Sequence, residues 1–599
     1  GGVPLRDRAF IRGVDARTDK IVDGVRDFGG FFRDPFNIEQ IEIGKGPGSA
    51  YSGRGSTGGT INLVSKQPFQ GNRYNGAVTL GTDLTKRATV DVNHSLAEHG
   101  IDGAAFRING MVHDADVAGR DEVDVMRWGI APSITFGLNG PTQLTLSYFH
   151  LSQDNIPDYG LPFDPATGAP VDVDRDNFYG LVDRDFDEVD NDLVTAEVTH
   201  RINQSWSLNN QARYGRTSKD FIVTKPEYTA GAATVTRDDR SRDSLDTILI
   251  NQTDVTGKFD TGWAGHNLTA GIELVRETSA NRGRSIDDAT DAALFDPNPD
   301  DPYNGAITSA ATRAESTTFT GAIYAFDTVS LGKYFDMVGG LRWDNFNTNY
   351  ENAAGDEFDR FDSAVTWRAA GVYKPLPYGS IYFAYGTSIN PSSEGLTLSA
   401  SNDSLEPEES ETFELGTKWD LFDERISVTA AAFRTNKTNA RTTAPGDTVT
   451  VLAGEQRVDG VELGIAGNVT EQWRLYGGYT FLDSEIESSQ NPAEVGNRFA
   501  NIAPHSFSLW SVYQFTPQID GGFGAQYVAR RYANNANTRW LPSYWRFDAT
   551  VGYKFNQTVD FRINALNLTD ETYFDSTHNG QHALVAPGRS VLFTTNVTF

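Results

Sequence analysis

The 599-residue sequence predicts an all-β membrane protein: an antiparallel transmembrane β-barrel of about 22 strands with a small N-terminal domain inside the lumen. Three observations predict this fold class. Segments of about ten residues alternate apolar and polar side chains, the spacers between them alternate short and long, and the glycine-rich start lacks both patterns. A hydrophobic content of only 38% is compatible with a membrane, because a barrel strand shows lipid every second residue.

Composition excludes several other classes. Asp+Glu total 80 against 51 Lys+Arg, a net charge of −29, which argues against a nucleic-acid partner. The absence of cysteine excludes disulfides, thiolate metal sites and a cysteine nucleophile. No run of about 18 apolar residues predicts a transmembrane helix. The opening GGVPLRDRAF has no apolar core of a signal peptide, so we expect the beginning of the protein to be missing.

Residues 1–70 form the first predicted unit. Short β runs at Ile38–Ile43 and Gly59–Val64 alternate with glycine turns, which indicates a small compact domain. A domain too small to fold well alone can be stabilised inside a wide barrel, and a lumen of about 22 strands must be plugged. We therefore expect residues 1–70 to be the C-terminal part of an incomplete plug and residues 71–599 to be the barrel.

The barrel strands are predicted from period-2 alternation. In the segment 544–555, Trp545, Phe547 and Val551 share one face, while Arg546, Asp548 and Lys554 share the other. Charges on the second face fit a hydrated lumen better than a dry sandwich core. Such segments lie near 72–81, 87–97, 102–112, 126–137, 142–152, 192–203, 205–217, 245–259, 265–277, 317–330, 334–346, 365–375, 379–389, 410–421, 424–435, 457–470, 472–483, 505–516, 519–530, 544–555, 558–567 and 590–599.

The spacers separate a membrane barrel from a soluble β-protein. Short turns such as 138–142 and 556–557 alternate with long stretches at 153–191, 218–244, 278–316, 390–409 and 568–589. Short turns on one side and long loops on the other are typical of outer-membrane barrels, with the long loops outside. A multi-domain soluble β-protein or a β-propeller is the alternative, but no repeat of about 40–50 residues is visible.

The N-terminal motifs resemble the plug of TonB-dependent outer-membrane receptors. The run from FIRG (10–13) through GKGP (44–47), GRGS (53–56) and GGTINLVSK (58–66) has that family's residue types in the same order. LEPEESETFELGTKWD (405–420), VDGVELG (458–464), NALNLTDETYF (564–574) and the terminal Phe599 extend the resemblance to the barrel. The family's TonB box and first plug strands have no counterpart in the chain.

The resemblance implies a function. VRDFGGFFRDPFNIEQIEIGKGP (25–47) looks most like ferric-siderophore receptors, especially the catecholate (Fiu-like) kind. It implies the outer membrane of a Gram-negative bacterium, TonB-dependent uptake of a ferric siderophore, and the TonB–ExbB–ExbD complex, lipid and lipopolysaccharide as partners. Iron(III) would enter only as the siderophore complex, with no intrinsic cofactor and no metal ligated by the protein.

Charges should hold the plug to the barrel. Period 2 turns Glu414 inward because Phe413 and Leu415 face lipid, and it turns Glu462 inward because Val461 and Leu463 face lipid. Carboxylates in a lumen need cations or water. By the resemblance, Arg12 and Lys45 match plug cations that meet barrel carboxylates. We expect a cluster of Arg12, Lys45, Glu414 and Glu462, the alternative being four separately hydrated charges.

Two groups of residues are candidates for binding the ligand. Phe28, Phe31, Phe32 and Arg33 on the plug could stack on catechol rings and attract their anionic oxygens. Arg539 and Trp540, in a basic and aromatic stretch near an extracellular loop, could do the same. The alternatives are plug-core packing for the phenylalanines and a solvated loop for the second group.

Other functions remain open from the residues alone. A TonB-dependent receptor could take another scarce solute, such as cobalamin, another metal chelate or an oligosaccharide, and a barrel could be a passive porin. An enzyme is not expected, because no G-x-S-x-G nucleophile elbow or convincing acid–base pair appears. The stretch 153–191 carries eleven Asp/Glu against two Arg, which opposes an anionic ligand. Asp172, Asp174, Asp176 and Asp183 in it are spaced like a calcium loop, although a solvated face explains them as well.

Overall fold

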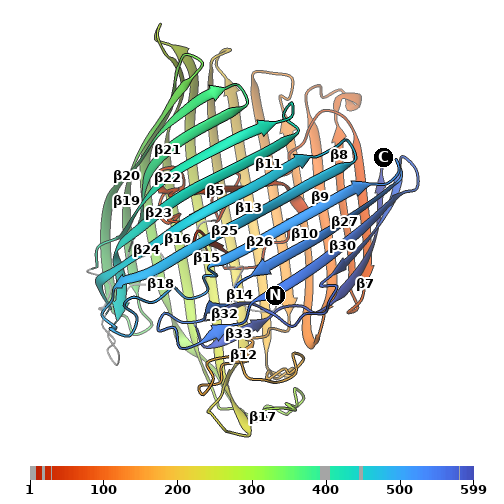
Figure 1. Cartoon of the computed structure of the whole chain (residues 1–599), viewed down its shortest axis with the longest axis vertical. Coiled ribbons are helices and arrows are strands. Elements are labelled where there is room, and N and C mark those ends of the chain that lie inside the picture. The colour runs from red at the N-terminus through yellow and green to blue at the C-terminus, as the bar shows by residue number, and fades with distance from the viewer. Residues whose placement is uncertain (1–8, 17–19, 28–29, 392–404, 444–449, 579) are drawn as a thin grey trace.

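The computed structural model describes residues 9–16, 20–27, 30–391, 405–443, 450–578 and 580–599, and its main body is a closed antiparallel barrel (Figure 1). Within that part of the chain, 22 strands form the wall. They are β7 (Arg73–Gly81), β8 (Lys86–Ser95), β9 (Ala105–Val117), β10 (Arg120–Phe136), β11 (Thr142–Asn155), β13 (Phe186–Arg201), β14 (Trp206–Glu227), β15 (Thr234–Asp260), β16 (Gly265–Ile286), β18 (Ile307–Leu331), β19 (Phe335–Glu351), β20 (Glu357–Leu376), β21 (Gly379–Asn390), β22 (Glu408–Leu421), β23 (Ile426–Thr443), β24 (Thr450–Asn468), β25 (Trp473–Ser488), β26 (His505–Gln514), β27 (Ile519–Val528), β30 (Tyr544–Lys554), β31 (Val559–Leu566) and β34 (Ser590–Thr598).

The wall closes where the last strand meets the first. β34 pairs antiparallel with β7 from Leu592↔Gly81 to Thr598↔Asn75. The predicted face of the strands is also confirmed: Phe413 and Leu415 of β22 are exposed on the outer wall, whereas Glu414 between them points to the lumen. The strand number and parity predicted from period-2 alternation are therefore correct.

The extracellular part differs from the sequence prediction. Two stretches expected as long loops, 218–244 and 278–316, are largely strand, because β14, β15, β16 and β18 continue well beyond the membrane. These strands reach 22 to 27 residues, against the ten or so needed to span. Outside the bilayer a strand needs only paired backbone hydrogen bonds and no apolar face. A polar sequence can therefore continue a strand there, and the absence of apolar alternation does not predict its end.

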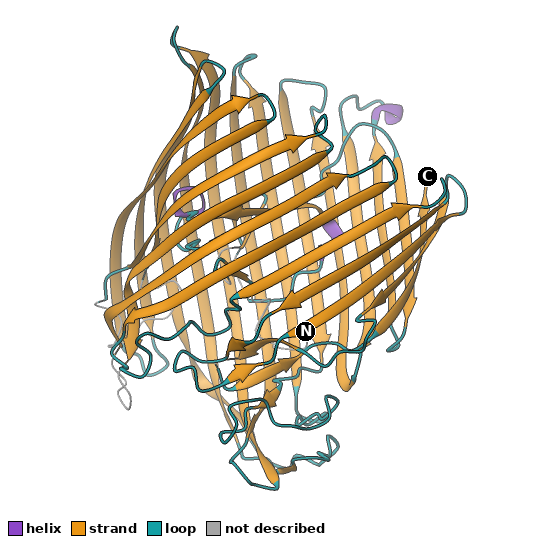
Figure 2. Ribbon diagram, in the orientation of Figure 1, coloured by secondary structure: helices purple, strands orange, loops and turns teal. Residues whose placement is uncertain are grey.

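The plug lies inside the barrel (Figures 1 and 2). Its elements are β1 (Phe10–Ile11), β2 (Val14–Asp15), β3 (Lys20–Val22), β4 (Val25–Arg26), the 3-10 helix η1 (Pro35–Asn37), β5 (Ile38–Lys45), α1 (Ser49–Ser52) and β6 (Gly59–Ser65). A four-stranded sheet has the order β4-β3-β6-β5, with β3 and β6 parallel. Gly58 before β6 has no room for a side chain, because a Cβ there would lie 2.1 Å from the carbonyl oxygen of Ile11.

The long loops gather at the lower end of Figure 1 and pack on one another. Their strands are β12 (Leu161–Pro162), β17 (Ala292–Ala293), β28 (Arg531–Tyr532), β29 (Trp540–Leu541), β32 (Phe574–His578) and β33 (His582–Val585). β12, β33 and β32 form one small sheet, and β28 pairs with β29. The short 3-10 helix η2 (Ala97–His99) lies in a turn at the opposite end. Among the described residues, none of the helices has the length and apolar character needed to span a bilayer.

Candidate functional site

A tight hairpin presents Arg12 to the barrel wall. Ile11 of β1 pairs with Val14 of β2, which leaves Arg12 and Gly13 as the two turn residues. Their φ angles are 51° and 83°, the left-handed values that a two-residue hairpin turn demands. The FIRG motif thus places an arginine at the tip of a rigid turn, where its long side chain can reach the wall.

The four charges expected to hold the plug lie together. The two Nη atoms of Arg12 lie 2.6 Å from Glu414 Oε2 on β22 and 3.0 Å from Glu462 Oε2 on β24. Lys45 Nζ, at the end of β5, lies 3.2 Å from Glu462 Oε1. We call these four residues the Arg12 anchor.

The surroundings reinforce the Arg12 anchor. The guanidinium of Arg12 lies 4.1 Å from the ring centroid of Phe433, and the hydroxyl of Tyr382 donates to Glu414 Oε1 at 2.5 Å. Burial disfavours the charged guanidinium, but the contacts with Glu414 and Glu462 outweigh it and hold the pKa of Arg12 above its ordinary value. Arg12 therefore stays charged.

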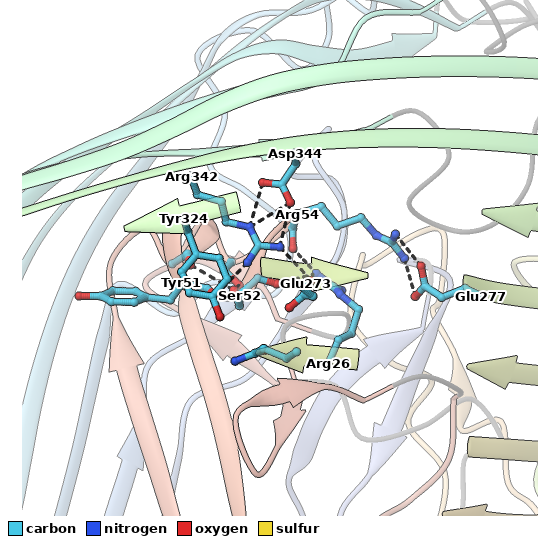
Figure 3. A network of polar contacts seen from close by, with 12 residues as sticks. Arg26, Tyr51, Ser52, Arg54, Glu273, Glu277, Tyr324, Arg342 and Asp344 are labelled. Atoms are coloured by element: carbon cyan, nitrogen blue, oxygen red, sulfur yellow. Dashed lines mark hydrogen bonds and ion pairs between the residues drawn. The ribbon is translucent and has the colours of Figure 1, made fainter. Parts of the chain in front are cut away.

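A second network joins the plug to a neighbouring part of the wall, at β16 and β19 (Figure 3). Arg54, after α1, pairs with Glu277 of β16 at 2.7 Å. Arg342 of β19 pairs with Glu273 at 2.8 Å and with Asp344 at 2.9 Å, and its Nη1 donates to the carbonyl of Tyr51 in α1 at 3.4 Å. We call Arg54, Glu273, Glu277, Arg342 and Asp344 the Arg54 anchor.

The Arg54 anchor is the part of the site that sequence reasoning missed. The sequence identifies GRGS only as a family motif and does not predict an ion pair for its Arg54. Period 2 contained the signal, since Glu273 and Glu277 lie on the face opposite the lipid-exposed Ile272 and Leu274. What the sequence could not supply is the pairing of Arg54 with a residue 223 positions away.

The plug segment with the predicted ligand-binding aromatics docks on β8–β14. Phe31 is only 2% exposed and packs with Phe36, Met111 and Leu151. Arg87 of β8 holds Asp34 with two hydrogen bonds, of 2.7 and 2.8 Å. In this conformation the ring of Phe31 is part of the interface between plug and wall, so ligand contact by Phe31 stays a prediction that requires the segment to move.

Phe32 and Arg33 are also engaged. Arg127 of β10 lies 4.0 Å from the ring centroid of Phe32. Arg33 pairs with Asp27 and lies 4.2 Å from the ring of Phe31. Phe28, the fourth predicted plug residue, lies outside the described residues.

Arg539 and Trp540 lie in the extracellular loops. Trp540 pairs with Tyr532 in the β28–β29 hairpin, and the guanidinium of Arg530 lies 4.0 Å from the centroid of its indole. Arg539 donates to the carbonyl of Gly580 at 2.7 Å and lies 6.0 Å from the ring of Phe163. These contacts place the pair in the packed loops, a different region from the wall that receives Phe31–Arg33.

The acidic loops bury two arginines together with some of their own carboxylates, among them Asp185 at 3% exposure. Arg120 and Arg237 are buried, and each caps loop carbonyls while pairing with an aspartate, Asp158 at 2.6 Å and Asp301 at 2.8 Å respectively. Asp172, Asp174 and Asp176 are exposed. Within the described residues, no group of three or more His, Asp or Glu side chains is arranged to hold a metal ion.

Comparison with known families agrees with this geometry. Residues 128–568 match the model of the TonB dependent receptor-like β-barrel, and residues 1–60 match that of the TonB-dependent receptor plug domain. The barrel match alone covers well over half of the chain.

Individual relatives point the same way. The chain is 36% identical to the probable TonB-dependent receptor BfrD of Bordetella pertussis, over 100% of this chain and 86% of that protein. It superposes on the crystal structure of the siderophore receptor PiuA of Acinetobacter baumannii with a TM-score of 0.95 at 33% identity, covering 100% and 92% of the two chains. The closed form of the ferric-catecholate import receptor Fiu of Escherichia coli K12 gives 0.91 at 31% identity, covering 100% and 91%.

Proposed function

The chain belongs to the TonB-dependent receptor family of outer-membrane proteins, and on that premise we propose that it imports a ferric siderophore of the catecholate class. We assign residues 1–70 to the plug and 71–599 to the barrel. The family consists of transport receptors and not of enzymes. Iron(III) is the cargo, carried within the siderophore complex.

The observation that carries the proposal is the anchored plug. A plug tied to the wall by Arg12–Glu414, Arg54–Glu277 and Asp34–Arg87 leaves the lumen only if all three ion pairs break, and each buried charge that loses its partner costs free energy. A passive porin has no use for such a plug. Transport therefore needs work from outside the chain, and we propose the TonB–ExbB–ExbD complex as its source.

The catecholate class is supported by chemistry and by likeness. Fiu is by its title a ferric-catecholate import receptor and PiuA a siderophore receptor. Ferric catecholates are anions with aromatic rings, which pairs such as Arg530 with Trp540 can bind by charge and stacking. We propose Arg539 and Trp540 as ligand contacts in the loops, and Phe28, Phe31, Phe32 and Arg33 as contacts made after the plug segment shifts.

The acidic loops are compatible with an anionic ligand. Asp172 and Asp174 are exposed to solvent, and the buried carboxylate of Asp185 is paired with Arg184. At physiological ionic strength the field of an exposed charge fades within about 8 Å. On the outer wall, exposed apolar side chains such as Leu274 and Phe319 fit lipid, and we propose lipid and lipopolysaccharide as neighbours there.

Growth under iron limitation tests the proposal. A Gram-negative strain without siderophore synthesis and without its own catecholate receptors should grow on a ferric catecholate only when it carries this protein. Ferric hydroxamate, cobalamin and an oligosaccharide serve as the alternative solutes. Rescue by one of these and not by the catecholate would replace the proposed ligand class. Rescue that persists in a strain lacking TonB would replace active transport by passive diffusion.

A further inference from the structure

The two plug anchors differ in their access to water. In the Arg54 anchor, the side chains of Glu277 and Arg342 are 0% exposed, that of Asp344 is 1% exposed, that of Arg54 is 5% exposed and that of Glu273 is 9% exposed. In the Arg12 anchor, Glu414 and Glu462 retain 13% and 12% exposure and Lys45 is 49% exposed. Arg12 itself is only 2% exposed, so the anchors differ in their carboxylates and in Lys45, and the Arg54 anchor is the drier of the two.

A polar cavity accounts for the difference. A space of about 630 Å³ lies against the Arg12 anchor, between β5 and the wall from β21 to β27. Besides the anchor charges, it is lined by polar side chains that include Tyr382, Lys418, Thr429, Thr480 and Gln526. Water in this space can hydrate Arg12 and the two glutamates as soon as they separate.

Among the described residues, Arg54, Glu277 and Arg342 line none of three cavities of about 320, 790 and 630 Å³, although the 790 Å³ cavity reaches Ser388 and Ile389 beside the loop after α1. α1 packs against β19, β20 and β21, and the loop after it is bound as well, with Gly55 N donating to Ile389 O at 2.7 Å. Separating Arg54 from Glu277 would leave a carboxylate without exposed surface and without its counter-charge. Such a separation costs far more than breaking a pair whose members become hydrated.

We propose that the plug opens in a fixed order: the Arg12 anchor releases, the Arg54 anchor holds, and the chelate passes between β5 and the β22–β25 wall. This inference rests on the proposed transport function. Arg12, Lys45, Lys418 and hydroxyl groups along this space can replace part of the hydration shell of an anionic chelate, and the three cations outnumber the carboxylates of Glu414 and Glu462 in the same lining. The Arg54 anchor then returns the plug to the same position after each passage.

Two engineered disulfides test the order in which the anchors open. The sequence contains no cysteine, so the introduced pairs cannot form mixed disulfides with other residues of the chain. G13C with V458C locks the Arg12 side, since a Cβ at Gly13 would lie 3.4 Å from Val458 Cγ2. Gly13 has a φ of 83°, so a side chain there is strained, and the reduced double variant is the control for that strain. T57C with S388C locks the loop beside α1, where the hydroxyl oxygens are 3.2 Å apart. Peptide masses establish that each disulfide has formed in the outer membrane.

Uptake of iron-loaded catecholate is then measured with each pair oxidised and reduced. The G13C/V458C lock should lower uptake at least ten-fold, with recovery on reduction, whereas the T57C/S388C lock should leave uptake within two-fold. Equal blocking by both locks, or free uptake through the G13C/V458C lock, overturns the proposal.

A second measurement needs no ligand. In planar bilayers, urea-induced conductance should be suppressed by the G13C/V458C lock and not by the other. Glu462→Gln should shift its onset to lower urea, while Lys86→Ala on the outer wall leaves it unchanged; an unshifted onset in Glu462→Gln contradicts the proposal. If the unmodified protein imports no iron chelate but the conductance follows this pattern, the proposed function fails and the order of opening stands.

Discussion

Glu414→Gln should loosen the plug without unfolding the barrel. The substitution keeps the size and shape of the side chain but removes its negative charge. The Glu414 carboxylate accepts hydrogen bonds from Arg12 at 2.6 Å and from Tyr382 at 2.5 Å. Breaking a dry ion pair costs about 3–5 kcal/mol. Arg12 retains Glu462, and solvent reaches this anchor, so we expect a smaller loss of about 2–3 kcal/mol in the free energy of plug release.

A double-mutant cycle with Arg12→Gln isolates the interaction. Plug release is followed through the urea dependence of limited proteolysis within residues 1–70, while far-ultraviolet circular dichroism verifies an intact barrel. The coupling energy between Arg12 and Glu414 should be about 1–3 kcal/mol. Lys86 and Asp114, an exposed pair 2.9 Å apart on the outer wall, form the matched control and should couple by less than about 0.5 kcal/mol. Equal and negligible coupling in both cycles would refute the reasoning.

Three further predictions concern the Arg54 anchor, the loops and the ligand. Glu277→Gln removes the carboxylate that pairs with the buried Arg54 and should destabilise the plug by about 3–5 kcal/mol, measured through the urea dependence of limited proteolysis within residues 1–70; an unchanged urea midpoint would contradict this. Burial lowers the pKa of His582 to about 4, below the unfolded value near 6.5, so the unfolded loop binds more protons between these pH values. The β12-β33-β32 sheet should therefore lose up to about 3 kcal/mol as pH falls through this window, measured as lower amide protection factors relative to the intrinsic exchange rate at each pH, and His582→Gln should abolish that pH dependence. Arg539→Gln should weaken binding of an anionic ferric catecholate about ten-fold at low salt and leave a neutral hydroxamate complex unaffected, as measured by tryptophan quenching; equal loss for both chelates would remove Arg539 from the ligand site.

The barrel strands could be predicted from the sequence, because the alternation of lipid-facing and lumen-facing side chains is visible within each strand. In 410–421, the alternation of apolar and polar residues determines which face of β22 is towards lipid. Glu414 lies on the other face and therefore points into the lumen. The length of strands β14, β15, β16 and β18 could not be predicted from the sequence, because a strand outside the bilayer needs no apolar face. Their polar residues in 218–244 therefore read as loop, although Glu227 and Thr236 still pair.

The contacts that a side chain makes were harder to predict than the strand, or the face of the strand, on which it lies. The Arg12 anchor followed from parity together with a family resemblance, whereas Arg54–Glu277 depends on the rotation of the plug within the barrel, which no local pattern encodes. Phe31 illustrates the same limit: an aromatic residue beside glycines can serve a ligand or a core equally well. Only the shape of the β8–β14 wall places it against Leu151 and Val189.

Uptake of radioactive iron tests the central claim most directly. Cells that lack other catecholate receptors and carry this protein are given iron-loaded catecholate, with and without a protonophore that collapses the proton gradient. Saturable accumulation that stops when the gradient collapses is the result expected of an anchored plug opened by an energised partner. Accumulation that is unsaturable and indifferent to the gradient, or no accumulation of any ferric chelate, would contradict the account.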